Sequence, residues 1–306
     1  MLDLYYNNIA GCIKNEGFEM LSTLKNLEFL NLGVNKFNTN ILSSLSHLSS
    51  LKYLYLYGNE MKGRIDIQEL DAMSNLEELN LSGNNITKFI SSREIRSPKN
   101  LSILYLDDIT VEGRSMLLQS LGALTHLKTL YLRDSNFKGT IFDQGSKVIN
   151  VKELYLDGSS LGENFLQSLE VLSSLRLLSL RRLNCTQPIQ DLSHNNMARG
   201  IPSWINNFSQ LSYLILGHNN IEAKIPIQLC NLTQLSLIDL SHNHLSGPIL
   251  PCLRSTSNSY RQQDGSYNAS APVSMDEPLE FTTKSRIPTE IGNLNEIHAL
   301  NLSHNI

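Results

Sequence analysis

The sequence has little net charge of either sign and no long apolar run. Its 306 residues carry a formal net charge of −4, with a pI of about 6.1. A nucleic-acid-binding surface needs an excess of basic residues, which this composition does not supply. No segment approaches the roughly 18 consecutive apolar residues that indicate a transmembrane helix. Both absences disfavour a nucleic-acid-binding protein and a protein that spans a membrane within these residues.

Cysteines are also few, and the usual catalytic patterns are missing. The four cysteines, Cys12, Cys185, Cys230 and Cys252, do not have the spacing of a zinc site. No set of nucleophile, base and orienting residue is visible, and no glycine-rich phosphate-binding loop. We therefore expect no enzyme activity, no cofactor and no bound metal.

What the sequence does contain is one pattern repeated at a nearly fixed interval. The segment from Leu235 to Leu245, LSLIDLSHNHL, has the frame LxxLxLxxNxL, which occurs 24 residues earlier between Leu211 and Ile221. This frame and period are those of a leucine-rich repeat. The two leucines of LxL share one face of a strand, and stacked coils bury such faces as a continuous core. We therefore predict an α/β solenoid with a parallel concave β-sheet and a 3₁₀ or irregular convex side, forming a horseshoe or superhelix.

The asparagine of each repeat has a donor and an acceptor, so a column of asparagines can satisfy backbone groups left open where each strand turns away. The positions in this phase are Asn7, Asn35, Asn59, Asn84, Ile109, Ser135, Ser159, Leu183, Asn195, Asn219, Asn243 and Asn305. Ile109 and Leu183 cannot replace the asparagine hydrogen bonds. We therefore expect the solenoid to be most deformable over residues 109–183.

Two irregularities interrupt the repeats. The interval of 12 residues between Leu183 and Asn195 is half a coil, which indicates an internal deletion over 183–195. Arg254 to Ser285 is polar and has no repeat frame, as expected of an insertion. We predict leucine-rich repeats over 1–253, a non-repeat island over 254–286 and a resumed, truncated repeat over 287–306. Because the sequence starts and stops inside repeats, and MLDLYYNNIAGCI is no signal peptide, we expect a fragment of a longer protein.

Cys230 and Cys252 occupy nearly the same phase on adjacent coils. Cys230 lies 11 residues after Asn219, and Cys252 lies 9 residues after Asn243. Neighbouring coils stack about 4.8 Å apart, and a disulfide needs Cα atoms about 4.4–6.8 Å apart. The pair is a disulfide candidate, and the alternative is two buried thiols. A disulfide would indicate an oxidising compartment.

The residues between and beside the paired leucines face outward on the predicted concave sheet. The candidate ligand-binding residues among them are Tyr105, Asp107, Tyr131, Arg133, Tyr155, Asp157 and Arg181. A tyrosine stripe beside alternating charges suits contact with a peptide. The alternative is that cross-strand tyrosines stabilise the sheet.

Asparagine sequons and histidines are the remaining candidate sites. Sequons for N-glycosylation begin at Asn80, Asn85, Asn100, Asn184, Asn207, Asn231, Asn268 and Asn301. A glycan on Asn80 would mask one end of the tyrosine stripe. His194, His218, His242 and His304 share one phase. They are interpreted as a solvated rim, with metal binding or pH sensing as the alternative.

Several segments resemble plant-type leucine-rich repeats, LxxLxLxxNxLxGxIPxxLxxLxxL. The diagnostic Gly-x-Ile-Pro stands as Gly200-Ile201-Pro202, and Ile225-Pro226 is a partial form. The segments KGRIDIQELDAMSNLEELNLSGN, EFTTKSR and IPTEIGNLNEIHALNLSHN are similar to those of plant receptor-like proteins, which are kinase-less cell-surface receptors. The resemblance implies a glycoprotein on the extracellular face of the plasma membrane. It also implies peptide or protein ligands, signal transduction through partner receptor kinases, and roles such as plant defence.

Two other functions fit the same repeats. One is a secreted inhibitor of microbial cell-wall-degrading enzymes, which the island and the extended array disfavour. The other is a truncated gene product without function, which the half coil at 183–195 and the missing caps favour.

Overall fold

The computed structural model describes residues 1–10, 21, 23–90, 98–109, 117–137, 150–161, 163–183, 200–248, 250, 252 and 299–305. The chain forms two compact units, Met1–Asn195 and Asn196–Ile306. The interpretation of 183–195 as half a coil and the island at 254–286 fall almost entirely outside the described residues.

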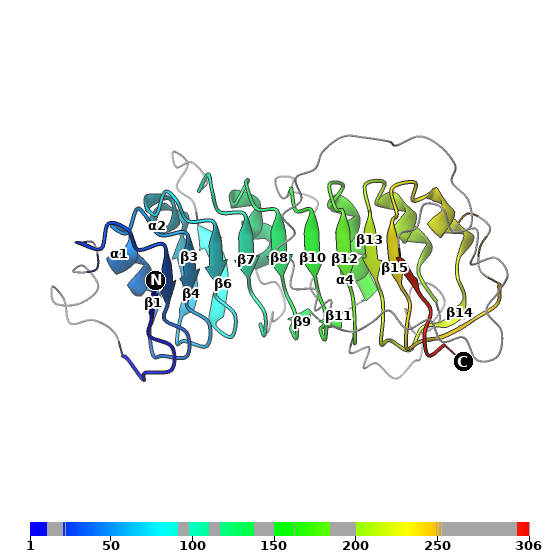
Figure 1. The fold of residues 1–306 in the computed structure, drawn as a ribbon, viewed down its shortest axis with the longest axis horizontal. Helices are drawn as coiled ribbons and strands as arrows, with labels where there is room; N and C mark the ends of the chain where they lie inside the picture. The colour runs from blue at the N-terminus through cyan, green and yellow to red at the C-terminus, as the bar shows by residue number, and fades with distance from the viewer. Residues whose placement is uncertain are drawn as a thin grey trace. The chain divides into compact units, whose positions relative to one another are not determined.

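The first unit is built on a parallel sheet with one strand from each coil (Figure 1). Its strands are β1 (Leu2–Asp3), β2 (Phe29–Asn31), β3 (Tyr53–Tyr55), β5 (Glu78–Asn80), β7 (Ile103–Tyr105), β8 (Thr129–Tyr131), β10 (Glu153–Tyr155) and β12 (Leu177–Ser179). Each strand pairs with the next in the same register, so that Leu54 lies opposite Leu79 and Leu79 opposite Leu104. These three leucines are fully buried, and the LxL frame therefore supplies the core as predicted.

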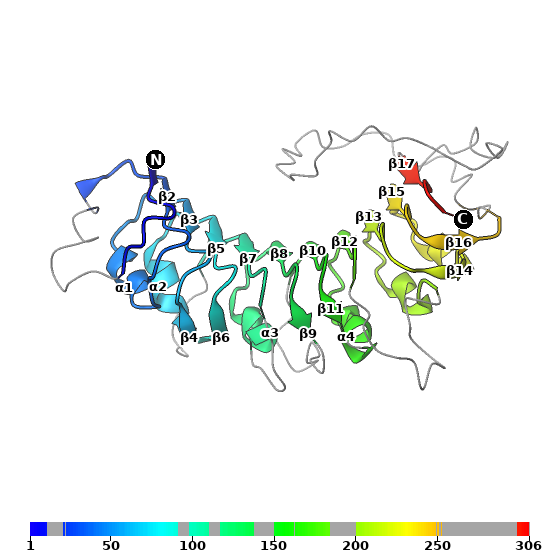
Figure 2. The ribbon, with the colours of Figure 1, turned by 90° about the horizontal axis from the view of Figure 1, so that it is seen from below.

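Short helices lie on the side of the first unit away from this sheet (Figure 2). They are α1 (Ile41–Leu45), α2 (Ile67–Ala72), α3 (Leu117–Ser120), η2 (Leu121–Ala123), α4 (Glu163–Ser168) and η3 (Leu169–Val171). The sequence predicted only 3₁₀ or irregular structure here. The α2 helix forms because Asp66 caps it, accepting a hydrogen bond from the backbone N–H of Gln68 at 2.9 Å.

Two further strand pairs, also parallel, were not predicted from the sequence. In the first unit, β4 (Lys62–Asp66) pairs with β6 (Asn85–Ile90), and β9 (Asn136–Phe137) pairs with β11 (Ser160–Leu161). These strands follow the asparagine-phase position, where the chain leaves the main sheet. Their pairing satisfies backbone groups at this turn that the main sheet does not reach.

The second unit repeats the architecture with fewer strands. Its parallel sheet contains β13 (Tyr213–Ile215), β15 (Leu237–Asp239) and β17 (Ala299–Asn301), beside the pair β14 (Glu222–Lys224) and β16 (His244–Ser246). The outer segments are the 3₁₀ helices η5 (Ser203–Asn207) and η6 (Ile227–Asn231), each following a proline of an Ile-Pro pair. Strand β17 pairs with β15 in the repeat register, so the repeat that resumes after 254–286 continues the stack of this unit.

The asparagine column forms a hydrogen-bonded ladder. The amide nitrogen of Asn84 donates to the carbonyl oxygens of Leu56 and Leu81 at 2.9 and 3.0 Å, and its oxygen accepts from Met61 N–H at 3.1 Å. Ser135 and Ser159 continue the ladder with fewer bonds. The Ser159 hydroxyl accepts from Ser135 N–H at 3.0 Å and donates to the Leu132 carbonyl at 2.8 Å. That the ladder is weakest across 109–183 stays a prediction.

Candidate functional site on the concave sheet

Three tyrosines from consecutive strands of the first unit form one stack. Tyr105, Tyr131 and Tyr155 end β7, β8 and β10, and the register places each directly opposite the next. The ring centroids of Tyr105 and Tyr131 are 4.2 Å apart, and those of Tyr131 and Tyr155 are 4.4 Å apart, with interplanar angles of 4° and 11°. The sequence placed these residues on one face, and the structure adds face-to-face contact between their rings.

The stack is largely closed to solvent. Tyr131 is 3% exposed and Tyr155 is 5% exposed, and both pack with Leu177, Ile103 and Tyr105. Burial raises the pKa of all three tyrosine hydroxyls, because a phenolate would lose its hydration. The rings therefore form a neutral floor across β7, β8 and β10, which is compatible with both the ligand-binding and the sheet-stabilising interpretation of the sequence.

Arg133 lies on this floor. Its guanidinium carbon is 4.5 Å from the ring centroid of Tyr131 and 5.1 Å from that of Tyr155. A guanidinium over two aromatic rings gains cation–π attraction, and its rotamer is fixed. Among the described residues, the Nε atom of Arg133 is buried without a hydrogen-bond partner. The site thus contains a donor whose hydrogen-bonding capacity is unused.

Aspartates fix the backbone beside this arginine. Asp107 Oδ1 accepts a hydrogen bond from Arg133 N–H at 2.7 Å. Two coils further on, Asp157 Oδ1 accepts from Arg181 N–H at 2.8 Å and from the Ser179 hydroxyl at 2.6 Å. Each aspartate therefore binds the backbone of the next coil, at the residue two positions after the end of that coil's strand. All seven residues predicted for the concave site lie at the ends of four consecutive strands, the three tyrosines as last strand residues and the four charged residues two positions further on.

Asp107 has an altered acidity. Burial raises its pKa from 3.8 to about 6, although the backbone N–H and the charge of Arg133 act in the opposite direction. The carboxyl group of Asp107 therefore changes charge near pH 6, beside Arg133. Below pH 6 the site becomes more positive.

This shift predicts how stability depends on pH. Because the folded-state pKa is raised, the folded chain binds more protons than the unfolded chain between about pH 4 and pH 6. Unfolding free energy should therefore fall as pH rises through this window and stay level above it. Asp107→Asn keeps the acceptor oxygen but cannot titrate, so we expect this variant to be about 1–3 kcal/mol more stable than wild type at pH 7 and equal to it near pH 4. Urea denaturation at both pH values measures this, and equal pH slopes for the two proteins would contradict it.

The predicted glycosylation sites divide by exposure. Asn85, Asn100, Asn207 and Asn231 are exposed. Asn80 and Asn301 are half-buried, and their side-chain oxygens accept from the backbone N–H of Ser82 and Ser303 at 3.0 and 3.1 Å. Asn80 lies directly opposite Tyr105 in the sheet, so a glycan there would stand beside the tyrosine stack. Asn184 and Asn268 lie outside the described residues.

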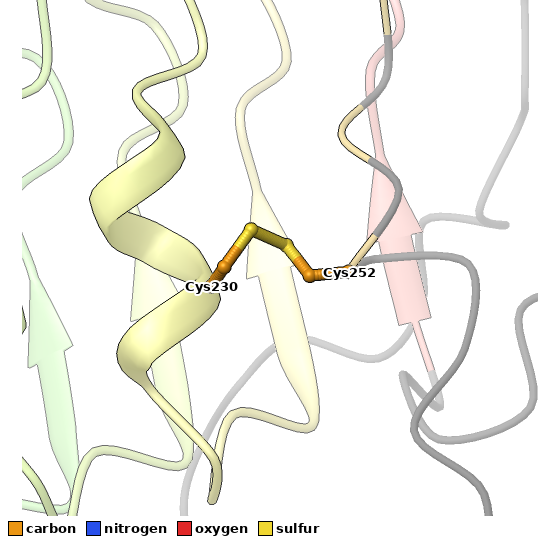
Figure 3. The surroundings of a disulfide bond; sticks show 2 residues. All are labelled: Cys230 and Cys252. Carbon is orange, nitrogen blue, oxygen red and sulfur yellow. A yellow bond between two sulfur atoms is a disulfide. The ribbon is translucent and has the colours of Figure 1, made fainter.

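The disulfide candidate and the histidine column belong to the second unit. Cys230, at the end of η6, is joined to Cys252 of the next coil, with Cα atoms 5.4 Å apart (Figure 3).

His218, His242 and His304 stack with ring centroids 4.0 Å apart, and each has the left-handed backbone conformation of its turn. Sequence phase alone did not reveal the ring stacking. His194 lies outside the described residues.

The described residues contain neither a metal-binding cluster nor a membrane-spanning helix. No group of three or more His, Cys, Asp or Glu side chains in this part of the chain is arranged to hold a metal ion. Within the same residues, no helix has the length and apolar character needed to cross a membrane.

Comparison with protein families matches two segments of the chain. A model described as "Leucine Rich repeats (2 copies)" matches residues 49–94, and one described as "Leucine rich repeat" matches residues 191–245. Among solved structures, a leucine-rich-repeat protein of Leptospira interrogans matches with 21% identity and a TM-score of 0.48, covering 99% of this chain and 84% of that one. An internalin of Listeria monocytogenes matches with 22% identity and a TM-score of 0.37, covering 79% of this chain and 74% of that one.

Curated relatives come from Arabidopsis thaliana. Receptor-like protein 9a is 39% identical over 70 residues, covering 22% of this chain and 8% of the relative. Receptor-like protein 45 is 44% identical over 57 residues, covering 19% of this chain and 6% of the relative. The matched segment is thus less than a tenth of the length of each relative. The repeat frame, the strand register and the family matches together show a leucine-rich-repeat fold. Within it, about a fifth of the chain is similar to plant receptor-like proteins.

Proposed function

We propose that this chain is part of the ligand-recognition ectodomain of a plant receptor-like protein. In this proposal the concave sheet of the first unit binds an extracellular peptide or protein, and partner receptor kinases transmit the signal at the plasma membrane. The observation that carries the proposal is the arginine held on a buried tyrosine stack. Sheet stability alone would not require Arg133 on top of these rings, with its Nε atom unpaired.

The chemistry of the site favours a ligand with acidic groups. A guanidinium presents a planar set of donors that can hold a carboxylate through two parallel hydrogen bonds. Because the tyrosine rings already hold the guanidinium of Arg133, binding costs little side-chain entropy. The column to which Arg133 belongs reads Asp107, Arg133, Asp157 and Arg181. Its charges therefore alternate in sign across coils about 4.8 Å apart. This alternation would select the order of charges along an extended peptide.

The test is a selection with a displayed library of random peptides. The 306-residue chain is the target, and peptides that it enriches are then measured individually against variants. We expect enriched peptides to carry an acidic residue and to bind Arg133→Ala at least about tenfold more weakly, since loss of a charge-assisted hydrogen bond costs about 1.5–3 kcal/mol. Arg133→Lys keeps the charge but lacks the planar fork, so its affinity should also fall.

Arg64→Ala is the matched control, because Arg64 is exposed on β4 and lies outside the concave strands. It should bind the selected peptides as wild type does. The proposed peptide site would be refuted if the selected peptides bound Arg133→Ala and wild type equally. Thermal unfolding of each variant shows whether a loss of binding reflects a loss of folding.

A further inference from the structure

A second column of charged residues lies immediately before the strands of the first unit. Its members are Glu28, Lys52, Glu77, Ser102, Lys128, Lys152 and Arg176. In the early coils opposite charges alternate. Lys52 Nζ lies 3.0 Å from Glu28 Oε1, and the hydrogen bond and charge of Glu28, followed by the charge of Glu77, raise the pKa of Lys52. In the later coils the alternation ends.

Lys128 and Lys152 follow each other on adjacent coils without an acidic partner. Within the residues that the structure describes, neither lysine forms an ion pair. Their backbones are joined directly, because Lys152 N–H donates to the Lys128 carbonyl at 2.7 Å. The backbones of two residues with like charge are therefore about one coil spacing, about 4.8 Å, apart. Unbalanced like charges of this kind favour binding of an anion.

These lysines line a cavity of about 510 Å³ at the edge of the sheet where the strands begin. Lys99 is a third cation of the lining, and Glu77 is its one acidic residue. Most other lining residues offer hydroxyl or amide groups, among them Asn100, Thr125 and Ser174. Leu127 is the one aliphatic residue among the described lining residues, which include the imidazole of His126 but no Phe, Tyr or Trp.

We propose that this cavity binds a linear oligosaccharide that carries a carboxylate on each sugar. Such a chain presents negative charges at regular steps, as the lysine column presents positive ones, and its hydroxyl groups match the polar lining. A single exposed ion pair contributes little, so a ligand that repeats its charge gains by contacting Lys99, Lys128 and Lys152 together. An acidic peptide is a weaker fit, because peptide recognition usually relies on aromatic or apolar anchors, which this lining lacks.

Asn100 links this cavity to glycosylation. It is a sequon asparagine within the lining, and its side-chain nitrogen donates to the Ser74 carbonyl at 2.7 Å. A glycan on this nitrogen would stand at the cavity. Ser102→Ala removes the sequon and leaves Asn100 in place, so the binding experiment uses the full chain in this background.

The experiment is calorimetric titration with an oligomer of 1,4-linked galacturonic acid that is long enough to span four coils. We expect binding that weakens with added salt and falls about tenfold or more in Lys128→Gln/Lys152→Gln, because two cationic contacts are lost. Lys25→Gln/Lys36→Gln makes the same charge change at two exposed lysines outside the cavity and should not alter the affinity. The fully methyl-esterified oligomer, which lacks the charges, should not bind.

Four results would overturn the proposal: no binding of the oligomer, equal binding by the Lys128/Lys152 variant, an equal loss in the Lys25/Lys36 control, or tighter binding of a hexaglutamate peptide. The last result would assign the cavity to acidic peptides. The inference is independent of the concave peptide site. Arg133→Ala should therefore retain oligosaccharide binding, whether or not it loses peptide binding.

Discussion

Replacing Tyr131 by alanine is expected to destabilise the first unit by about 3–5 kcal/mol, the cost of removing a buried aromatic side chain. Tyr131 is the middle ring of the stack and is 3% exposed. Its loss would leave a cavity between Tyr105 and Tyr155 and remove one of the two rings beneath Arg133. Chemical denaturation followed by circular dichroism measures the loss.

Tyr131→Phe separates the ring from its hydroxyl. Because the hydroxyl is neutral and the ring makes the contacts, we expect this variant to stay within about 1 kcal/mol of wild type. It should also bind the selected peptides normally. If phenylalanine destabilised the unit as much as alanine, stacking would not be the source of the stability, and the description of the tyrosines as a floor would be wrong.

Removing the disulfide should have the next largest effect. Cys230 and Cys252 are separated by 22 residues in sequence, and closing a loop of this size stabilises a fold by about 3 kcal/mol through the entropy of the unfolded chain. Cys230→Ser/Cys252→Ser should therefore lower the unfolding free energy of the second unit by about this amount. In thermal unfolding, a reducing agent should lower the melting temperature of wild type to that of the double variant.

The control for this experiment is Cys12→Ser/Cys185→Ser, which retains the bridging pair. Its melting temperature should remain sensitive to reductant. A reductant-insensitive melting temperature in the wild-type protein would show that the bridge does not stabilise the unit. Peptide mapping without reduction identifies the bridged pair directly.

The sequence predicted the strands well because their signal is local and repeated. The LxL frame gives each strand an inward face, so β7, β8 and β10 and the pairing of Tyr105 with Tyr131 follow from counting residues. The convex side was harder to predict from the sequence, because its helices depend on individual capping residues such as Asp66. The repeat consensus carries no such information.

The sequence predicted where the candidate site residues lie on the sheet, but it did not predict how far they are buried. Sequence phase placed Tyr131 and Arg133 on the concave side, but their contact depends on side-chain rotamers that a repeat pattern does not specify. The basic cavity was missed for a different reason. Its lysines lie just before the strands, and only the outward residues within and just after the strands were considered. A break in charge alternation after Glu77 was the available signal.

The constant register of the sheet has an evolutionary consequence. Asparagine-phase intervals between Asn7 and Leu183 range from 24 to 28 residues, yet Leu30, Leu54 and Leu79 remain directly opposite one another. Differences in length are absorbed away from the concave strands. A gene can therefore gain, lose or exchange residues in one coil's outer segment without shifting the concave residues of its neighbours. The concave surface can diversify one coil at a time, by point substitution or by recombination between related genes.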